Sequence, residues 1–339
     1  MRCQAARVGC AHRHPFKGPS AQPKRGRCGP IASATETATP ASLSTLQEAY
    51  KRFDAIPPSQ KFDFSGEVLD AFQAVKAAGS IPKWGVALEA TKRRSVMQNE
   101  LRQVGIKNPG AIAVPSVRND AAFLATVVLS TSVLAVIAGV VLPGDLGGFA
   151  AYGIGGISIV VLAIGSTSPG LLQFFIDKFS LIFPDYKERV TRHEAAHFLV
   201  GYLAGCPVTS YSILLGQERV EFAEARLQKR LYEKTLEDEE VDTLAIVAVA
   251  GIAAEGQQYE EVGVVMGQTA DLLDLQRILL RSKNKLSDQA QQNMTRWAVM
   301  TAGGLLRRYK KEHEAVIAAM SRGASVFECI RAIEEAGPA

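Results

Sequence analysis

The sequence predicts a mainly α-helical protein with a small β element, preceded by a two-helix transmembrane hairpin and a small helical N-terminal region. Three observations lead to this fold class. Apolar residues recur at helical spacing before residue 118 and almost throughout the chain after residue 271. Two long uncharged runs lie between residues 121 and 176, and one short segment, 208–215, reads as a β-strand. With 339 residues, 47% of them hydrophobic and 21% charged, the chain can hold one or two domains with a core.

Residues 1–40 have the composition of an organelle transit peptide. They contain seven Lys or Arg residues and no acidic residue before Glu36, together with several Ser and Thr. A disordered basic tail that binds an acidic partner is the alternative. Removal of the seven basic residues would change the formal net charge from +4 to −3, so the basic balance says little about partners. We expect a chloroplast protein rather than a mitochondrial one, with no nucleic-acid partner.

Residues 41–118 are expected to form a small helical module. Leu43, Leu46, Tyr50 and Phe53 share one face of the first amphipathic segment, and breakers separate it from the next. This region offers no residues that point to chemistry.

Residues 119–178 are expected to form the membrane hairpin. The two spans are placed at about 121–142 and 149–164, each in an uncharged run that exceeds the roughly 20 residues needed to cross a bilayer. The sequence 143–148, rich in glycine, is expected to make a tight link between them. Arg118 precedes the hairpin, Lys178 follows it and the link has no positive charge, so both flanks are expected on one side, the stromal side. A buried hairpin in a soluble protein is the alternative.

The segment from His193 to His197 reads His-Glu-Ala-Ala-His, the spacing of two zinc ligands on one helical face. Residues four apart lie about one turn above each other, so both imidazoles can meet one ion, with Glu194 placed to take a proton from a water. The helix is expected to start near Tyr186, with Asp185 and Glu188 as a capping box, and to end before Gly205.

A catalytic zinc keeps three protein ligands, so one further ligand must come from elsewhere in the chain. The residues considered for it are Asp271, Asp274, Glu255, His313 and Cys206. Gly201 is expected to leave room beside the second histidine.

From about residue 186 to 336 the chain resembles the peptidase domain of the FtsH-type zinc metallopeptidases, peptidase family M41. The resemblance lies in residues 192–200, 208–215, 250–255 and 267–272, which follow the order of the family's motif helix, strand, Gly-Gly-Arg-Ala-Ala-Glu segment and Gly-Ala-Ser-Asn-Asp-Leu segment. The resemblance implies a zincin-like helical peptidase domain over 183–336 and a Zn²⁺ ion held by His193, His197 and Asp271. Glu255 and Asp274 remain as alternative ligands, and Glu255 also as a residue that orients a histidine.

Two departures from the family bear on activity. Only about twenty residues separate the second span from the motif helix, and no Gly-x-x-x-x-Gly-Lys-Ser/Thr phosphate loop occurs in the chain, so we expect no ATPase here. The densely charged segment 218–242 is expected to be a solvated helix or a mobile flap.

The expected function is that of a membrane-anchored zinc metalloendopeptidase, with Glu194 as general base. Its expected partners are unfolded or partner-delivered protein substrates, the membrane, other copies of the chain and ATPase-bearing FtsH relatives. A non-proteolytic subunit that assembles with those relatives is the alternative, and a zinc-stabilised structural domain is a third interpretation.

Overall fold

The computed structural model divides the chain into two units, Met1–Thr39 and Pro40–Ala339. All of the first unit lies outside the described residues, and so does the predicted transit peptide. The structure describes residues 42–57, 61–87, 92–112, 118–180, 182–214, 218–222, 236–260 and 267–337.

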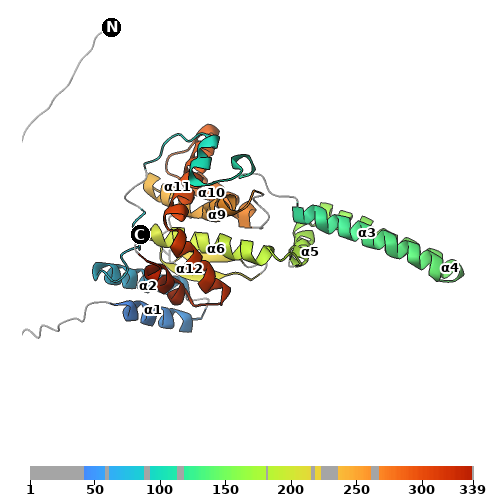
Figure 1. Ribbon diagram of the computed structural model, residues 1–339, viewed down its shortest axis with the longest axis horizontal. Helices are drawn as coiled ribbons and strands as arrows, with labels where there is room; N and C mark the ends of the chain where they lie inside the picture. Colours follow the sequence, from blue (N-terminus) through green and yellow to red (C-terminus); the bar gives the residue numbers. More distant parts are fainter. Residues whose placement is uncertain are drawn as a thin grey trace, which may run out of the picture. The chain divides into compact units, whose positions relative to one another are not determined.

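The described residues form twelve α-helices, two short 3-10 helices and one two-stranded sheet, which confirms the mainly α class with a small β element (Figure 1). The elements before the hairpin are α1 (Leu43–Ala55), α2 (Lys61–Ala77), η1 (Gln98–Val104) and η2 (Pro109–Ala111). They are followed by α3 (Arg118–Val141), α4 (Gly144–Thr167), α5 (Pro169–Ser180), α6 (Tyr186–Leu203), β1 (Val208–Ser212) and β2 (Arg219–Phe222). The last helices are α8 (Asp238–Ala248), α9 (Ala250–Gln258), α10 (Gly267–Arg281), α11 (Asp288–Arg308), α12 (Lys310–Ser321) and α13 (Val326–Glu335).

Helices α3 and α4 form the hairpin, and each is long and apolar enough to cross a membrane. Their apolar side chains point mostly outward, with Val136 67% and Phe149 80% exposed, so this is not a buried hairpin of a soluble core. The predicted six-residue link is wrong, because only Leu142 and Pro143 separate the two helices and the glycines after them are helical. A Cβ on Gly147 would lie 2.6 Å from the Leu142 carbonyl oxygen, so the close helix contact needs glycine there.

Helix α5 packs on the hairpin. The rings of Phe123 and Phe179 lie edge to face, 5.5 Å apart, and the Asn119 amide donates a hydrogen bond to the Ser180 hydroxyl at 2.9 Å. The start of α3 and the end of α5 are therefore neighbours.

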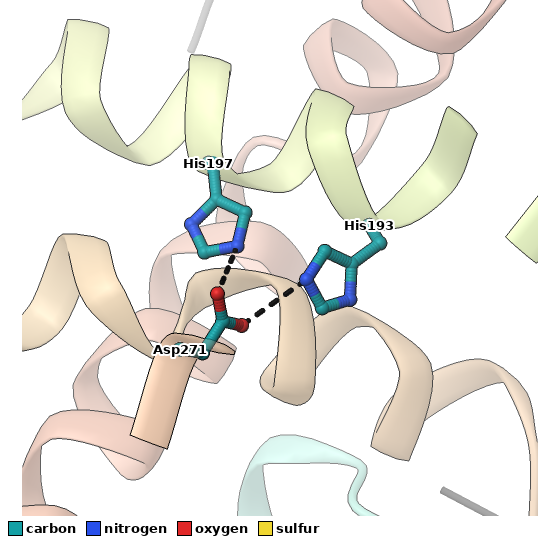
Figure 2. Close-up of side chains that lie close together, drawn as sticks. All are labelled: His193, His197 and Asp271. Carbon is teal, nitrogen blue, oxygen red and sulfur yellow. Dashed lines mark ion pairs between the residues drawn. The ribbon is translucent and has the colours of Figure 1, made fainter. Parts of the chain in front are cut away.

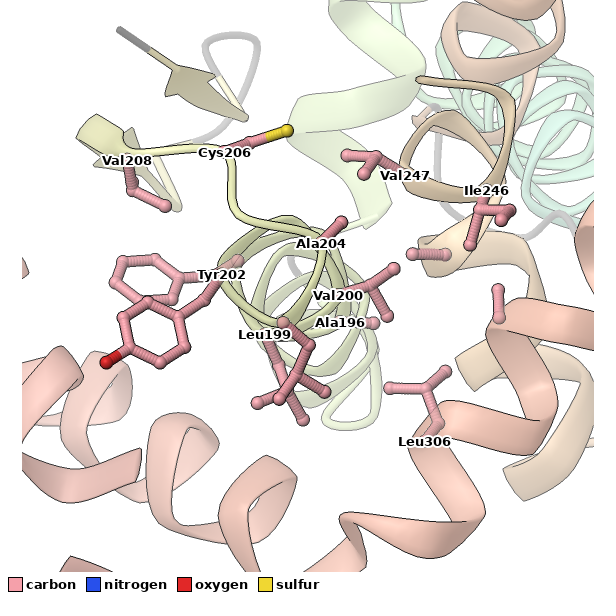
Figure 3. Close-up of a cluster of buried hydrophobic side chains, with 14 of the residues drawn as sticks. Ala196, Leu199, Val200, Tyr202, Ala204, Cys206, Val208, Ile246, Val247 and Leu306 are labelled. Atoms are coloured by element: carbon pink, nitrogen blue, oxygen red, sulfur yellow. The ribbon is translucent and has the colours of Figure 1, made fainter. Parts of the chain in front are cut away.

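Residues that precede the hairpin in the sequence and residues that follow it share one hydrophobic core. Phe72 of α2 packs against Tyr202 of α6, with ring centroids 6.2 Å apart, and the Ala87 N–H donates to the Leu203 carbonyl at 2.8 Å. Figure 3 shows this core gathered around α6, with Val208 of β1 and Leu306 of α11 turned toward it. Two segments that share a core must lie on the same side of any membrane that the hairpin crosses.

Helix α6 contacts α8, α9, α11, α12 and both strands. The strand expected over 208–215 ends at Ser212, where β1 pairs antiparallel with β2, and Leu215 lies outside the described residues. Of the predicted charged flap, residues 223–235 also lie outside the described residues, while α8 begins at Asp238. The expected helical character after residue 271 is confirmed by α10 to α13.

Candidate metal centre

Helix α6 has the predicted boundaries, beginning at Tyr186 and ending just before Gly205, whose φ of +80° favours glycine. The capping box is wrong: the Asp185 side chain caps no backbone N–H and accepts instead from the Arg189 guanidinium at 2.9 Å. A buried arginine one turn later in the helix competes for the carboxylate more strongly than a backbone N–H does.

Three side chains from two helices converge in the way a metal centre requires (Figure 2). Nε2 of His193 lies 3.1 Å from Oδ2 of Asp271, and Nε2 of His197 lies 3.2 Å from Oδ1 of the same carboxylate. The three ligand atoms all lie within 4.8 Å of one another. Asp271, which α10 brings to the motif helix, is the ligand that the family resemblance implies, and it lies in the second turn of α10.

The other nitrogen of each imidazole is held from outside the centre. Nδ1 of His193 lies 2.8 Å from Oε1 of Glu255, and Nδ1 of His197 lies 2.8 Å from the Val247 carbonyl oxygen. With Nδ1 occupied in each ring, Nε2 is the nitrogen directed at Asp271, an arrangement typical of metal-ligating histidines. Glu255, which the sequence left as ligand or as orienting residue, has the position of the orienting residue.

Two separate helices, α8 and α9, lie behind the two rings. The chain turns at Val249 (φ −105°, ψ 10°), between α8 and α9, so α8 supplies the Val247 carbonyl and α9 supplies Glu255. A continuous helix would have directed these two groups along one axis.

Gly251 is a site residue whose role sequence reasoning missed. A Cβ there would lie 2.3 to 2.4 Å from three atoms of the His193 ring, so only glycine lets α9 approach the imidazole this closely. A glycine inside an otherwise apolar helical run was the signal available in the sequence.

Gly201 serves a different purpose from the one expected. A Cβ on it would lie 2.2 Å from the ring of Phe222 in β2, so the space beside it is filled by that ring and is not left beside His197.

The charges at the centre favour a cation. Burial lowers the pKa of His193, but Asp271 and Glu255 outweigh it and raise this pKa well above its usual value. Burial also lowers the pKa of His197, and Asp271 again raises it overall. Burial raises the pKa of Asp271, yet the two imidazoles hold it at about 2. In the metal-free protein, protons drawn to the rings supply the positive charge that the carboxylates stabilise.

Glu194 follows the first histidine in α6 and is 3% exposed. Burial raises the pKa of its carboxyl, while His193 and His197 oppose that increase. A carboxyl with a raised pKa holds a proton more readily than an ordinary one, which suits a group that accepts and returns a proton.

The donor set itself tests whether a metal ion fits. Nε2 of His193 and Oδ2 of Asp271 are buried, and neither has a hydrogen-bond partner in the described part of the chain, although they lie 3.1 Å apart. Buried polar atoms without partners are costly, and a cation bonded to both would remove that cost. Two imidazole nitrogens and a carboxylate oxygen suit a borderline transition metal such as zinc.

The remaining sequence candidates lie elsewhere. Asp274 is exposed and pairs with Arg277 at 2.7 Å. His313 is buried, its Nε2 lies 3.1 Å from the Arg192 carbonyl oxygen, and burial lowers its pKa to about 4. Cys206 is buried and forms no disulfide bond. Among the described residues, none of these three belongs to the group around Asp271.

In comparisons with known proteins, no family model, no curated protein and no solved structure matches the chain.

Proposed function

We propose that this chain is a membrane-anchored zinc metalloendopeptidase of the FtsH type that has no ATPase of its own and hydrolyses unfolded or partner-delivered proteins. The observation that carries the proposal is the convergence of His193, His197 and Asp271, on a helix that also holds Glu194. Structural zinc sites usually fill four positions with cysteine and histidine. Three ligands of this kind are typical of catalytic sites instead, which disfavours the interpretation as a zinc-stabilised structural domain.

The chemistry divides between the ion and the chain. A zinc ion bound by His193, His197 and Asp271 would supply Lewis acidity, which activates a water and polarises the scissile carbonyl. Glu194 takes the proton of the attacking water and returns it to the leaving amine. Glu255 and the Val247 carbonyl keep the two imidazoles in the tautomer that leaves Nε2 free to bind.

The hairpin supports the membrane part of the proposal. Helices α3 and α4 are apolar, long and exposed, and an even number of crossings is what the core shared by residues 46–112 and 195–333 requires. We place the peptidase domain on the stromal side of a chloroplast membrane, either thylakoid or inner envelope, because of the transit-peptide composition of residues 1–40.

The sequence contains no phosphate loop, so unfolding must be supplied from elsewhere. Partner ATPases of the FtsH type, or substrates that are already unfolded, meet that need. The same absence motivates the alternative, a non-proteolytic subunit of an assembly with such relatives.

The test compares wild type with Glu194→Gln in the full chain, using metal analysis and cleavage of an unfolded protein with and without an ATPase-bearing relative. Loss of a general base lowers the hydrolysis rate by about 10²- to 10⁴-fold while the metal content stays unchanged. Glu188→Gln is the matched control, since Glu188 lies on the same helix with its side chain 55% exposed. No cleavage by wild type under either condition, with metal bound, would favour the non-proteolytic subunit.

A further inference from the structure

Helix α9 connects the metal centre to a segment that precedes the membrane hairpin. Near its start, Gly251 contacts the His193 ring, and one turn later Glu255 lies against His193 Nδ1. The rest of α9 is contacted by residues 104–107, at the end of η1. The residues joined by the Gln257–Val104 and Lys107–Gln258 hydrogen bonds are 153 and 151 positions apart, and both long apolar helices lie between them in the sequence.

Hydrogen bonds fix this contact from both sides. The Lys107 N–H donates to the Gly256 carbonyl at 2.9 Å, and the Lys107 ammonium donates to the Gln258 carbonyl at 2.8 Å. In the other direction, the Gln257 amide donates to the Val104 carbonyl at 2.8 Å and to the Gly303 carbonyl at 2.6 Å. These four hydrogen bonds at Gly256, Gln257 and Gln258 leave the end of α9 little freedom to slide or rotate.

Side-chain packing at the same place is tight. A Cβ on Gly256 would lie 3.1 Å from Cδ1 and 3.3 Å from Cγ2 of Ile106, a side chain that is 1% exposed. These distances are shorter than ordinary van der Waals contacts, so Ile106 sets how closely the backbone at Gly256 approaches. Glu255 is the preceding residue of the same helical turn, so its carboxylate moves with that backbone.

We propose that residues 104–107 are a positioning segment of the metal centre, which sets the orientation of the His193 ring through Gly256 and Glu255. The proposal rests on the proposed function, because it takes His193 as a metal ligand. The segment contacts neither metal nor substrate. It holds the helix whose carboxylate decides which way Nε2 of His193 points.

The experiment uses the full chain in detergent and Co²⁺ as the metal. In Gly256→Ala the new methyl group meets Ile106 and moves the backbone of α9, and Glu255 with it, from its present position. We expect the Co²⁺ affinity to fall about tenfold, the lower limit of the loss seen when a residue that hydrogen-bonds a metal ligand is changed. The Co²⁺ absorption bands should shift as well. Ile106→Val removes the nearer atom, Cδ1, and should restore affinity in the Gly256→Ala protein to within about twofold of wild type.

Two further variants separate positioning from general stability. Gly304→Ala is the matched control, because a Cβ there would meet only Val104 Cγ1, at an ordinary 3.9 Å, and Co²⁺ affinity should not change. In a Glu255→Gln background, Gly256→Ala should add no further loss, since the path through Glu255 is already broken.

A third measurement needs no metal. In the metal-free protein with ¹⁵N-labelled histidine, the Nδ1–H resonance of His193 reports the hydrogen bond to Glu255, and Gly256→Ala should shift it. The proposal is overturned if Gly256→Ala lowers thermal stability but leaves Co²⁺ affinity and this resonance unchanged, or if its effect is equal in the Glu255→Gln background. If wild type binds neither Co²⁺ nor zinc, the proposed function fails, and the resonance alone decides the positioning role.

Discussion

Helix α6 and the α3–α4 hairpin reverse the usual relation between polarity and burial. Helix α6 buries His193, Glu194 and His197, while its charged residues Lys187, Glu188 and Arg192 are not buried. The hairpin helices have an apolar composition, yet their side chains are largely exposed. Burying charge is costly unless it is paired, and exposing apolar surface to water is costly as well. In the function proposed above, a cation offsets the first cost in α6 and lipid offsets the second in the hairpin.

The largest effect we expect comes from placing a charge on the exposed hairpin face. Val133→Arg, near the middle of α3 and 57% exposed, should disfavour membrane insertion by about 3 kcal/mol. Val141→Arg, at the end of the same helix, should have little effect, because arginine there can extend to the interface. Extraction from membranes with alkaline carbonate measures the difference, and equal, full retention of both variants would contradict a membrane-embedded hairpin.

A second comparison places the same substitution in each region. Gly251→Ala in α9 forces a methyl group into the His193 ring, and we expect at least a tenfold loss of zinc affinity with about 1–3 kcal/mol of destabilisation. Gly155→Ala in α4 meets no atom within 4 Å and should leave both quantities unchanged or slightly improved. Zinc titration and thermal unfolding test the pair. Normal zinc affinity in Gly251→Ala would mean that the His193 ring is not held as described.

The metal centre should respond to pH in a way the hairpin does not. Because the pKa values of His193 and His197 are raised in the metal-free fold, the stability that these protonated rings contribute is full below about pH 6.5 and is lost as pH rises through the raised values. Asp271, with a pKa of about 2, stays charged throughout. The increase in Tm on adding zinc should therefore grow between pH 6 and 8. An increase in Tm that shrinks over this range would show that protons and metal do not compete here.

The smallest effect concerns the rejected ligand Asp274. Its exposed pair with Arg277 should matter little, so Asp274→Asn should change zinc affinity less than about twofold. Asp271→Asn is the contrasting variant, and it should remove most zinc binding. A comparable loss of zinc affinity in the two variants would contradict the assignment of Asp271 as the ligand from α10.

The sequence was sufficient for features that depend on local spacing. The ends of α6 follow from its apolar pattern and Gly205, and the two histidines share a face because they are four residues apart. Features that depend on neighbours in space were not predictable in this way. The Asp185 carboxylate pairs with Arg189 and therefore does not cap the helix, and α3 and α4 approach closely at Gly147. Gly251 matters only because α9 packs against the His193 ring of α6. The family resemblance supplied Asp271, which spacing alone left among several candidates.

The hydrogen bond between Asn119 and Ser180 closes the chain across the whole segment that holds α3, α4 and α5. Because contacts within the α3–α5 segment already hold its two ends together, the segment adds little to the loop-closure entropy that is lost when the rest of the protein folds. Helices α3, α4 and α5 thus form a self-contained unit. In the proposed membrane location this unit would enter the bilayer by itself, and the preceding and following parts of the chain would then pack together at its base.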